Sequence, residues 1–139
     1  MTKRVVVTGM ALTSPLGSNI NTAFESLQKL ENCVEYNKDL DQYQKLNTRL
    51  SAHVKGFEIP PSYNRKVTRT MGPLSIMAGR TAEQALEDAG LLGDEIITNG
   101  QTGVSYGSSS GSLDAIIDFY GMQVDKVVRG LNSGSYVKM

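Results

Sequence analysis

Two short runs of apolar and β-branched residues, each followed by a glycine-containing loop and a helical pattern, constrain the fold of this chain most. They are residues 4–9, RVVVTG, and residues 102–107, TGVSYG. The first run is continuously apolar rather than alternating, which is typical of a strand buried on both faces of a sheet. Two successive strand–loop–helix units predict an α/β domain with a parallel sheet.

Helical periodicity follows the first run. Apolar residues recur at helical spacing from Ile20 to Leu30, and either Ser18 or Asn19 is placed to cap the N-terminus. Residues 22–25, TAFE, also fit a capping box.

The clearest helix is predicted at residues 70–89. Pro73 lies in its first turn, where the missing N–H costs little, and Gly90 fits the left-handed position after its end. One stripe is mostly alanine, which predicts close packing and a largely buried helix: Met71, Leu74, Ala78, Ala82, Ala85 and Ala89. A third helix is predicted to begin at Leu113, whereas residues 130–139 show no regular pattern.

Residues 31–63 lose all periodicity and end at Pro60 and Pro61. We interpret them as a long irregular insertion with a short helix near residues 39–46. Connections of this length in compact proteins are often functional.

Composition excludes several classes of function. Among 139 residues, 14 basic and 14 acidic side chains give a formal net charge of zero, so general attraction to nucleic acid or to an anionic membrane is not predicted. The apolar start of the chain is interrupted at residues 8–9 and 13–15, and no stretch approaches the roughly 20 apolar residues of a membrane span. Cys33 is the only cysteine, so an internal disulfide is impossible. We therefore expect a cytoplasmic protein.

Nucleotide-binding and metal motifs fit poorly. Gly9 and Gly17 do not form the G-x-G-x-x-G fingerprint, and the glycine- and serine-rich residues 103–112 lack the lysine of a phosphate-binding loop. Residues 103–112 can be a tight strand-to-helix turn or a loop whose small side chains leave room for a ligand. Cys33 lies near Glu31 and Glu35, which oppose its ionisation, and with His53 as the single histidine a zinc cluster cannot form.

One stretch carries unbalanced positive charge. No acidic residue occurs between Glu58 and Glu83, while Arg65, Lys66 and Arg69 are present. If this stretch is helical, Arg65 and Arg69 share a face. Cations near a helix N-terminus interact unfavourably with the helix dipole. Either these side chains are simply exposed to water at the start of a helix, or they bind an anionic partner.

In order and spacing, four blocks resemble β-ketoacyl-acyl carrier protein synthases: residues 4–19, 64–71, 71–91 and 103–112. The resemblance spans the chain and implies a thiolase-like α/β fold, in which residues 1–139 form the N-terminal portion of the first half-domain, incomplete by itself. It also implies a homodimer.

The resemblance further implies a decarboxylating Claisen condensation of an acyl thioester with malonyl-carrier protein. The family uses a nucleophilic cysteine and two histidines for this reaction. Neither Cys33 nor His53 matches their motifs, so we expect the machinery downstream of this chain and assign no catalytic residue here. No metal or nucleotide cofactor is implied, because the substrate arrives on the carrier protein's phosphopantetheine.

Secondary roles can be transferred by position. Ser110 matches a residue that lines the acyl pocket, and Tyr136 lies near a position that reaches toward the pocket of the partner subunit. Arg65, Lys66 and Arg69 match the cluster that docks acyl carrier protein, an electrostatic task. Two hypotheses follow: the N-terminal part of a condensing enzyme of fatty-acid or polyketide synthesis, or a non-catalytic module that binds carrier proteins or partner synthases.

Overall fold

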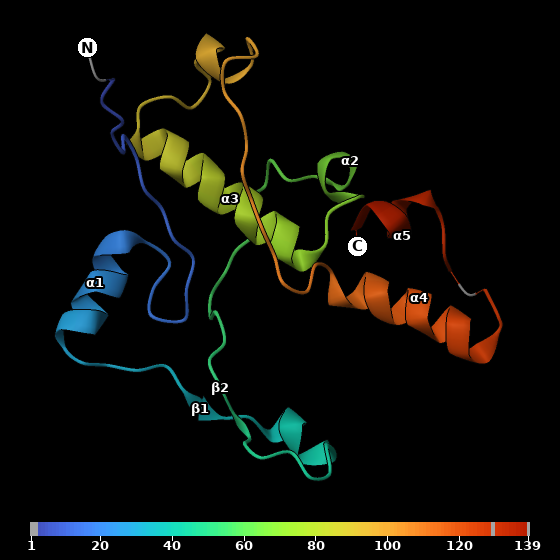
Figure 1. The fold of residues 1–139 in the computed structure, drawn as a ribbon. Coiled ribbons are helices and arrows are strands. Elements are labelled where there is room, and N and C mark those ends of the chain that lie inside the picture. The colour runs from blue at the N-terminus through green and yellow to red at the C-terminus, as the bar shows by residue number, and fades with distance from the viewer. Residues whose placement is uncertain (1–2, 129, 139) are drawn as a thin grey trace.

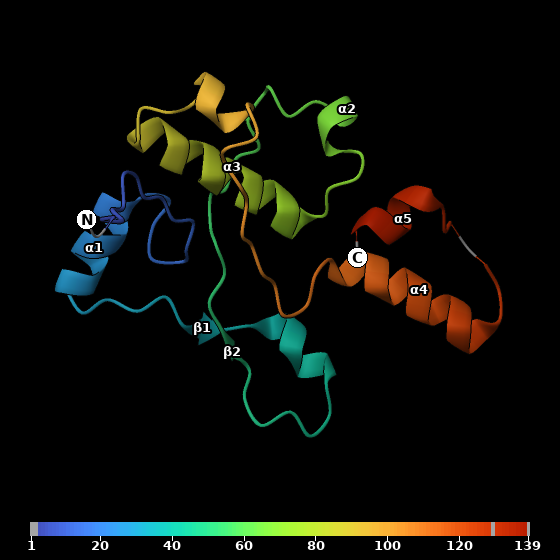
Figure 2. The same cartoon turned by 45° about the horizontal axis from the view of Figure 1, so that its top comes forward.

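The computed structural model describes residues 3–128 and 130–138 and consists of helices joined by long extended connections (Figure 1). In chain order the elements are α1 (Ile20–Gln28), β1 (Glu35–Tyr36), the 3-10 helix η1 (Lys38–Gln42), β2 (Leu50–Ser51), α2 (Arg65–Thr68), α3 (Pro73–Asp88), the 3-10 helix η2 (Glu95–Ile97), α4 (Leu113–Asp125) and α5 (Ser133–Lys138). In Figures 1 and 2, α3 lies centrally between α1 and the α4–α5 pair, and the β1–β2 region projects from the other elements.

Helix α1 begins where one of the two candidate caps predicts. The Asn19 side chain accepts a hydrogen bond of 3.0 Å from the backbone N–H of Thr22. The capping box at residues 22–25 is wrong, because Thr22 already lies inside the helix and receives this bond rather than starting the helix. Gly17 packs directly on the first turn, where a Cβ atom would lie 2.7 Å from the backbone nitrogen of Ala23.

Helix α3 confirms the predicted helix and its end, whereas it begins at Pro73 rather than at Thr70. Pro73 occupies its first position, and Gly90, with φ of +69°, follows the C-cap Ala89. Residues 9–13 run beside this helix in the opposite direction. A Cβ atom on Gly9 would lie 2.6 Å from the backbone nitrogen of Ala89, so the two backbones approach too closely for a side chain.

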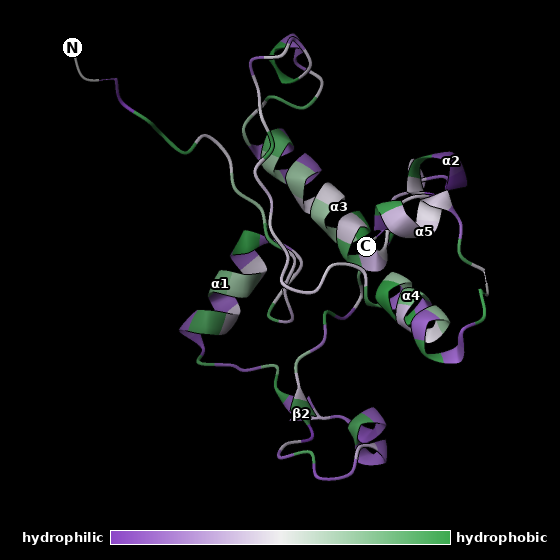
Figure 3. Cartoon of the chain, turned by 45° about the vertical axis from the view of Figure 1, so that its right-hand side comes forward, coloured by the Kyte–Doolittle hydropathy of each residue, from purple (hydrophilic) through white to green (hydrophobic). Residues whose placement is uncertain are grey.

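The predicted burial of α3 is wrong for this chain. None of its residues is buried, and the buried positions in the described part of the chain are Ala23, Gly72, Ser112 and Ala115. The stripe residues Met71, Ala78, Ala85 and Ala89 are only half-buried. Figure 3 shows hydrophobic residues along several helices without a common centre. The alanine stripe thus has a packing surface that the described residues cover only partly.

Gly72 and Ser112 lie in close contact between α3 and α4. A Cβ atom on Gly72 would lie 2.8 Å from the Cβ atom of Ser112, and both residues are buried. Each residue is the N-cap of its helix. The N-termini of α3 and α4 are therefore held together at this point.

The two predicted strands are extended but unpaired. Residues 4–9 and 102–107 are not assigned as strand, and Val5 and Val104 are 96% and 94% exposed. Among the described residues, no strand lies in hydrogen-bonding register with either segment. The sequence therefore correctly predicts extended backbone in both segments, whereas the predicted parallel sheet is not formed among the described residues. A strand forms only where a neighbouring strand supplies its hydrogen bonds.

The insertion at residues 31–63 is partly ordered. β1 and β2 pair antiparallel, with Glu35 opposite Ser51 and Tyr36 opposite Leu50. The short helix expected near residues 39–46 is the 3-10 helix η1, capped by the Asn37 side chain. Two ion pairs brace the region, Lys55–Glu35 at 2.8 Å and Arg49–Asp41 at 3.0 Å.

The C-terminal helices confirm one prediction and add an element. Helix α4 begins at Leu113 as predicted, and its C-cap Lys126 adopts a left-handed φ of 57°. Helix α5 was not predicted, since residues 130–139 show no periodicity. The Phe119 ring of α4 meets the Tyr136 ring of α5 edge to face at 5.9 Å between centroids. No helix in the described ranges is long and apolar enough to cross a membrane.

Candidate functional site

A single helical turn presents the basic cluster. The Asn64 side chain caps α2 by accepting hydrogen bonds from the backbone N–H groups of Lys66 and Val67, at 2.9 and 3.3 Å. The backbone N–H of Arg69 donates to the carbonyl of Arg65 at 3.0 Å, which places these residues one turn apart. The prediction that Arg65 and Arg69 share a face is thereby confirmed.

The three cations, which we call the basic triad (Arg65, Lys66 and Arg69), are all exposed. In the described part of the chain, no carboxylate lies within 4.0 Å of any of them. Arg80 differs, because it pairs with Glu83 at 3.2 Å and Glu87 at 3.3 Å. The positive charge of the triad is therefore not neutralised by a neighbouring carboxylate among the described residues, whereas the charge of Arg80 is neutralised by Glu83 and Glu87.

Tyr63 precedes the triad and ties this region to α3. Burial raises the pKa of the Tyr63 hydroxyl, and the nearby Glu83 carboxylate raises it further. The same Glu83 carboxylate holds Arg80, whose pKa is also raised by the hydrogen bond. A Cβ atom on Gly79 would lie 3.3 Å from the Tyr63 hydroxyl oxygen, so the loop before α2 packs against the middle of α3.

The glycine- and serine-rich loop borders a cavity of about 270 Å³ between α3 and α5. Its walls are Leu74, Ser75, Ala78, Tyr106, Ser108, Gly111, Ser112, Val137 and Lys138. The Ser108 hydroxyl accepts hydrogen bonds from the backbone N–H groups of Ser110 and Gly111 at 3.4 and 3.1 Å. The loop therefore makes the tight turn of the first interpretation, and its role in leaving room for a ligand stays a prediction.

The predicted acyl-pocket residues border this cavity without forming its walls. Ser110 is exposed and lies between the wall residues Ser108 and Gly111. Tyr136 is 55% exposed, packs on Phe119 and precedes the wall residues Val137 and Lys138. Ser110 and Tyr136 are thus each adjacent in sequence to residues that line this cavity, and their roles in acyl binding stay predictions.

Sequence reasoning missed the walls supplied by α5. One signal for this helix was available: Asn132 stands just before it, and its side chain accepts a hydrogen bond of 2.8 Å from the backbone N–H of Gly134. Asparagine before a short helix is a typical start signal. Without an apolar period after it, that signal alone did not predict a helix.

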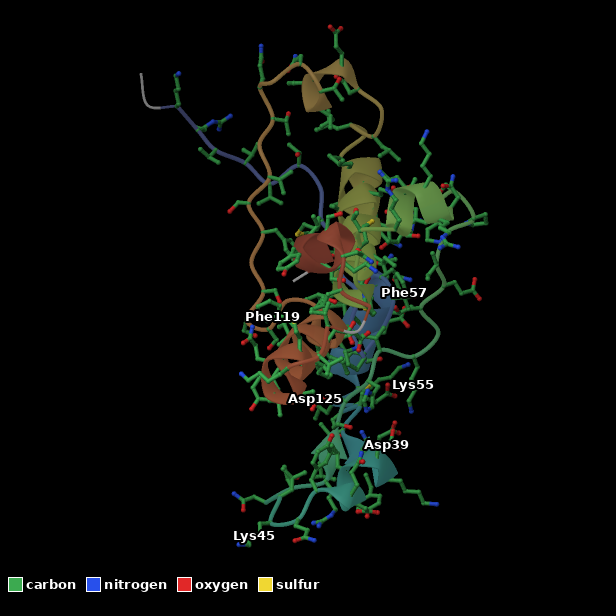
Figure 4. All side chains as sticks on the ribbon, turned by 90° about the vertical axis from the view of Figure 1, so that its right-hand side faces the viewer. Asp39, Lys45, Lys55, Phe57, Phe119 and Asp125 are labelled. Atoms are coloured by element: carbon green, nitrogen blue, oxygen red, sulfur yellow. The ribbon has the colours of Figure 1, made fainter. Side chains whose placement is uncertain are left out.

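Cys33 and His53 do not form a catalytic pair among the described residues. Cys33 is partly exposed and lines an apolar cavity of about 420 Å³ with Leu16, Leu27 and Val34 among its walls. The Nε2 atom of His53 lies 2.9 Å from Asn37 Nδ2 and 2.9 Å from Ser51 Oγ. His53 therefore has a structural role beside β1 and β2. Figure 4 shows the surrounding side chains, with Asp39, Lys45 and Lys55 labelled in this projecting region.

Comparison with known sequences identifies the family. A profile of the family described as "Beta-ketoacyl synthase, N-terminal domain" matches residues 2–136. The chain belongs to the β-ketoacyl synthase family. This confirms the resemblance carried by the four sequence blocks.

Curated relatives agree with this assignment. The chain is 30% identical over 139 residues to 3-oxoacyl-[acyl-carrier-protein] synthase 1 of Escherichia coli (strain K12), covering 97% of this chain and 32% of that protein. It is 30% identical over 133 residues to the synthase 1 of Buchnera aphidicola subsp. Baizongia pistaciae, covering 96% of this chain and 32% of the relative. It therefore spans about a third of the length of these synthases.

A solved structure confirms the fold. The crystal structure of a β-ketoacyl synthase from Burkholderia phymatum matches with a TM-score of 0.92 and 43% sequence identity, over 99% of this chain and 34% of that chain. The described elements are thus arranged as in the N-terminal part of a thiolase-like synthase.

Proposed function

We propose that this chain supplies the N-terminal part of a β-ketoacyl-acyl carrier protein synthase in fatty-acid or polyketide synthesis. The complete enzyme would catalyse decarboxylating condensation of an acyl thioester with malonyl-carrier protein and act as a homodimer. The family match and the relatives' names as 3-oxoacyl-[acyl-carrier-protein] synthases support this. Because neither Cys33 nor His53 matches the family's catalytic motifs, we expect the chain by itself to be inactive.

Within that enzyme, the basic triad would dock acyl carrier protein. The observation that carries this proposal is the exposure of Arg65, Lys66 and Arg69 without a carboxylate neighbour among the described residues. Unneutralised surface charge raises the association rate with an oppositely charged partner and selects against other partners. No metal or nucleotide is required, since the acyl group would arrive on the carrier's phosphopantetheine.

Charge reversal tests the docking surface. These 139 residues would replace the matched third of the Burkholderia phymatum synthase in one polypeptide, which we call the hybrid synthase. Arg65→Glu with Arg69→Glu should weaken binding of an acidic carrier protein about tenfold or more, and added salt should weaken binding to the unmodified hybrid. Lys29→Glu with Lys38→Glu makes the same change in net charge at exposed cations elsewhere and should have little effect. Equal losses in both double variants would contradict the proposal.

Product formation separates the two functional hypotheses. The hybrid synthase should form β-ketoacyl product, and Cys33→Ala should leave its rate unchanged, while the 139-residue chain alone should form none. A hybrid that folds and binds carrier protein without condensing would favour the non-catalytic module instead.

A further inference from the structure

The loop between η2 and residues 102–107 carries an asparagine followed by a glycine, Asn99 and Gly100. The sequence has eight asparagines, and Asn99 alone precedes a glycine. Both residues are exposed. Gly100 has a φ of +87°, which favours glycine, and a Cβ atom built on it would meet no atom within 4 Å. Water and solutes therefore reach the backbone on this side of Asn99.

The hydrogen bonds that shape this loop join residues close in sequence. The Thr102 hydroxyl donates to the carbonyl of Ile96 at 2.7 Å and closes the loop. The backbone N–H of Asn99 donates to the carbonyl of Glu95 at 3.0 Å. Because these partners all lie within eight positions of one another, we expect the loop to keep this form whatever the rest of the polypeptide contains.

The side-chain amide of Asn99 is folded over the following peptide bond. Its Oδ1 atom accepts a hydrogen bond of 3.0 Å from the backbone N–H of Gln101. Such a bond polarises the amide carbonyl and would stabilise negative charge developing on Oδ1, as a donor in an oxyanion hole does. Among the described residues, the N–H of the intervening Gly100 donates no hydrogen bond. A polarised carbonyl thus lies next to a free backbone nitrogen.

The hydrogen bond alone does not select a site. Four other asparagines accept the same bond from the N–H two residues on: Asn32, Asn37, Asn64 and Asn132. Each of them is followed by a residue with a side chain, which shields the backbone nitrogen and restricts φ and ψ. Glycine imposes neither constraint. Only at Asn99 does the polarised amide precede an unshielded and flexible nitrogen.

We propose that Asn99 is a site of spontaneous deamidation and isoaspartate formation. Water or hydroxide takes the proton of the Gly100 nitrogen, the nitrogen forms a bond to Cγ of Asn99, and Nδ2 takes up a proton and leaves as ammonia. One water molecule then opens the cyclic imide. Cleavage of the new bond to Cγ gives aspartate, whereas cleavage of the original bond to the backbone carbonyl carbon gives isoaspartate.

No group is oxidised or reduced in this sequence, and water is the only co-reactant. Both products carry a new negative charge directly before residues 102–107, and isoaspartate also lengthens the backbone by one carbon atom. The inference does not depend on the proposed function.

Incubation of the 139-residue chain at neutral pH, followed by trypsin digestion and mass spectrometry, tests the proposal. Tryptic peptide 81–126 contains Asn99 as its single asparagine, and peptide 130–138 contains Asn132 as its own. Peptide 81–126 should gain the mass that converts an amide to a carboxylate about tenfold faster, because conformations open to glycine are costly for other residues. The rate should rise with pH, since ring closure removes a proton from nitrogen. Labelling by an isoaspartyl-specific methyltransferase identifies the isoaspartate.

Three variants assign the reaction to this pair. Asn99→Gln should abolish the mass gain, because glutamine would have to close a larger ring. Gly100→Ala should slow it about tenfold. Gly93→Ala is the matched control: Gly93 has a φ of +83° and equally open surroundings but follows a leucine, so the rate should not change.

Equal rates at Asn99 and Asn132 in the unmodified chain would overturn the proposal, and so would equal rates in the two alanine variants. The same digest of the hybrid synthase yields peptide 81–126 in a longer polypeptide. Asn99 should react there as well, and its protection in the hybrid would contradict the local origin of the reactivity.

Discussion

The backbone N–H of Met10 donates a hydrogen bond of 2.9 Å to Oδ2 of Asp88, 78 residues later and at the last residue of α3. An acidic side chain at a helix C-terminus opposes the helix dipole, so Asp88 is better explained by this contact than by helix formation. Three residues on, the Thr13 and Thr81 hydroxyl oxygens lie 2.7 Å apart. Together these bonds hold residues 10–13 along α3.

This contact predicts that Gly9 cannot carry a side chain. In Gly9→Ala the new Cβ would overlap the backbone of α3 at Ala85 and Ala89, and neither backbone group can move without disturbing the helix. Overpacking of this kind typically costs about 1–3 kcal/mol. We expect faster amide exchange at Met10 as its bond to Asp88 is lost. Gly121→Ala, at a helical glycine with open space around it, is the control and should leave Met10 exchange unchanged. Equal protection of Met10 in both variants would contradict the predicted close approach.

Elements with local signals were predictable from the sequence. The polar cap at Asn19, Pro73 at the first position of α3 and Gly90 after its end all act within a few residues, and the corresponding helix ends agree with prediction. Elements that depend on distant partners were not. The antiparallel pair β1–β2 joins residues about 15 positions apart without a periodic pattern, and α5 has only a capping asparagine.

Burial was the least predictable property, because it depends on what lies opposite a residue rather than on the residue itself. Valine at positions 5–7 indicates a strand buried on both faces, and the extended backbone agrees, but the covering surface is not supplied by the described residues. The candidate site divides in the same way. The face shared by Arg65 and Arg69 follows from helical spacing, whereas the cavity beside Ser110 depends on how α3 and α5 lie against the loop, which no local pattern predicts.

A second prediction concerns the charge pair beside β1. The hydrogen bond from Lys55, and then its positive charge, lower the pKa of Glu35 below its usual value, and the pKa of Lys55 is raised in return. A lowered carboxyl pKa stabilises the folded arrangement above the pKa of an unfolded glutamate, and that contribution is lost as pH falls through the folded value. The β1–β2 pairing should therefore loosen in acid. A titration followed by carbon NMR at the Glu35 carboxyl should show a higher pKa in Lys55→Met but not in Lys38→Met. An identical Glu35 pKa in both variants would show that the ion pair is absent in solution.

A third prediction tests the acyl-pocket role of Ser110. In the hybrid synthase, Ser110→Phe should shorten the acyl chains accepted while sparing the shortest substrates, because a large ring would fill space beside the cavity near Ser108 and Gly111. Product chain lengths measured by mass spectrometry check this. Ser62→Phe, at an exposed serine before α2, should leave the distribution unchanged. A uniform loss for every chain length would indicate misfolding and remove the case for a size gate.

The last prediction concerns the stability of the isolated chain. Its buried positions in the described ranges are two alanines, a glycine and a serine, while valines of both extended segments and the apolar face of α4 at Ile117 and Tyr120 stay exposed. Leaving even ~400 Å² of apolar surface in water forgoes about 10 kcal/mol at about 25 cal/mol per Å², which is comparable to the whole stability of a domain. We therefore expect a broad, weakly cooperative denaturant transition and binding of a hydrophobic dye, both of which should be absent from the hybrid synthase. Circular dichroism and dye fluorescence during urea titration measure this directly. A monomer with a sharp two-state transition and no dye binding would show that these residues close a core by themselves, because only a packed interior gives such cooperativity. That result would favour the independent binding module over the synthase part.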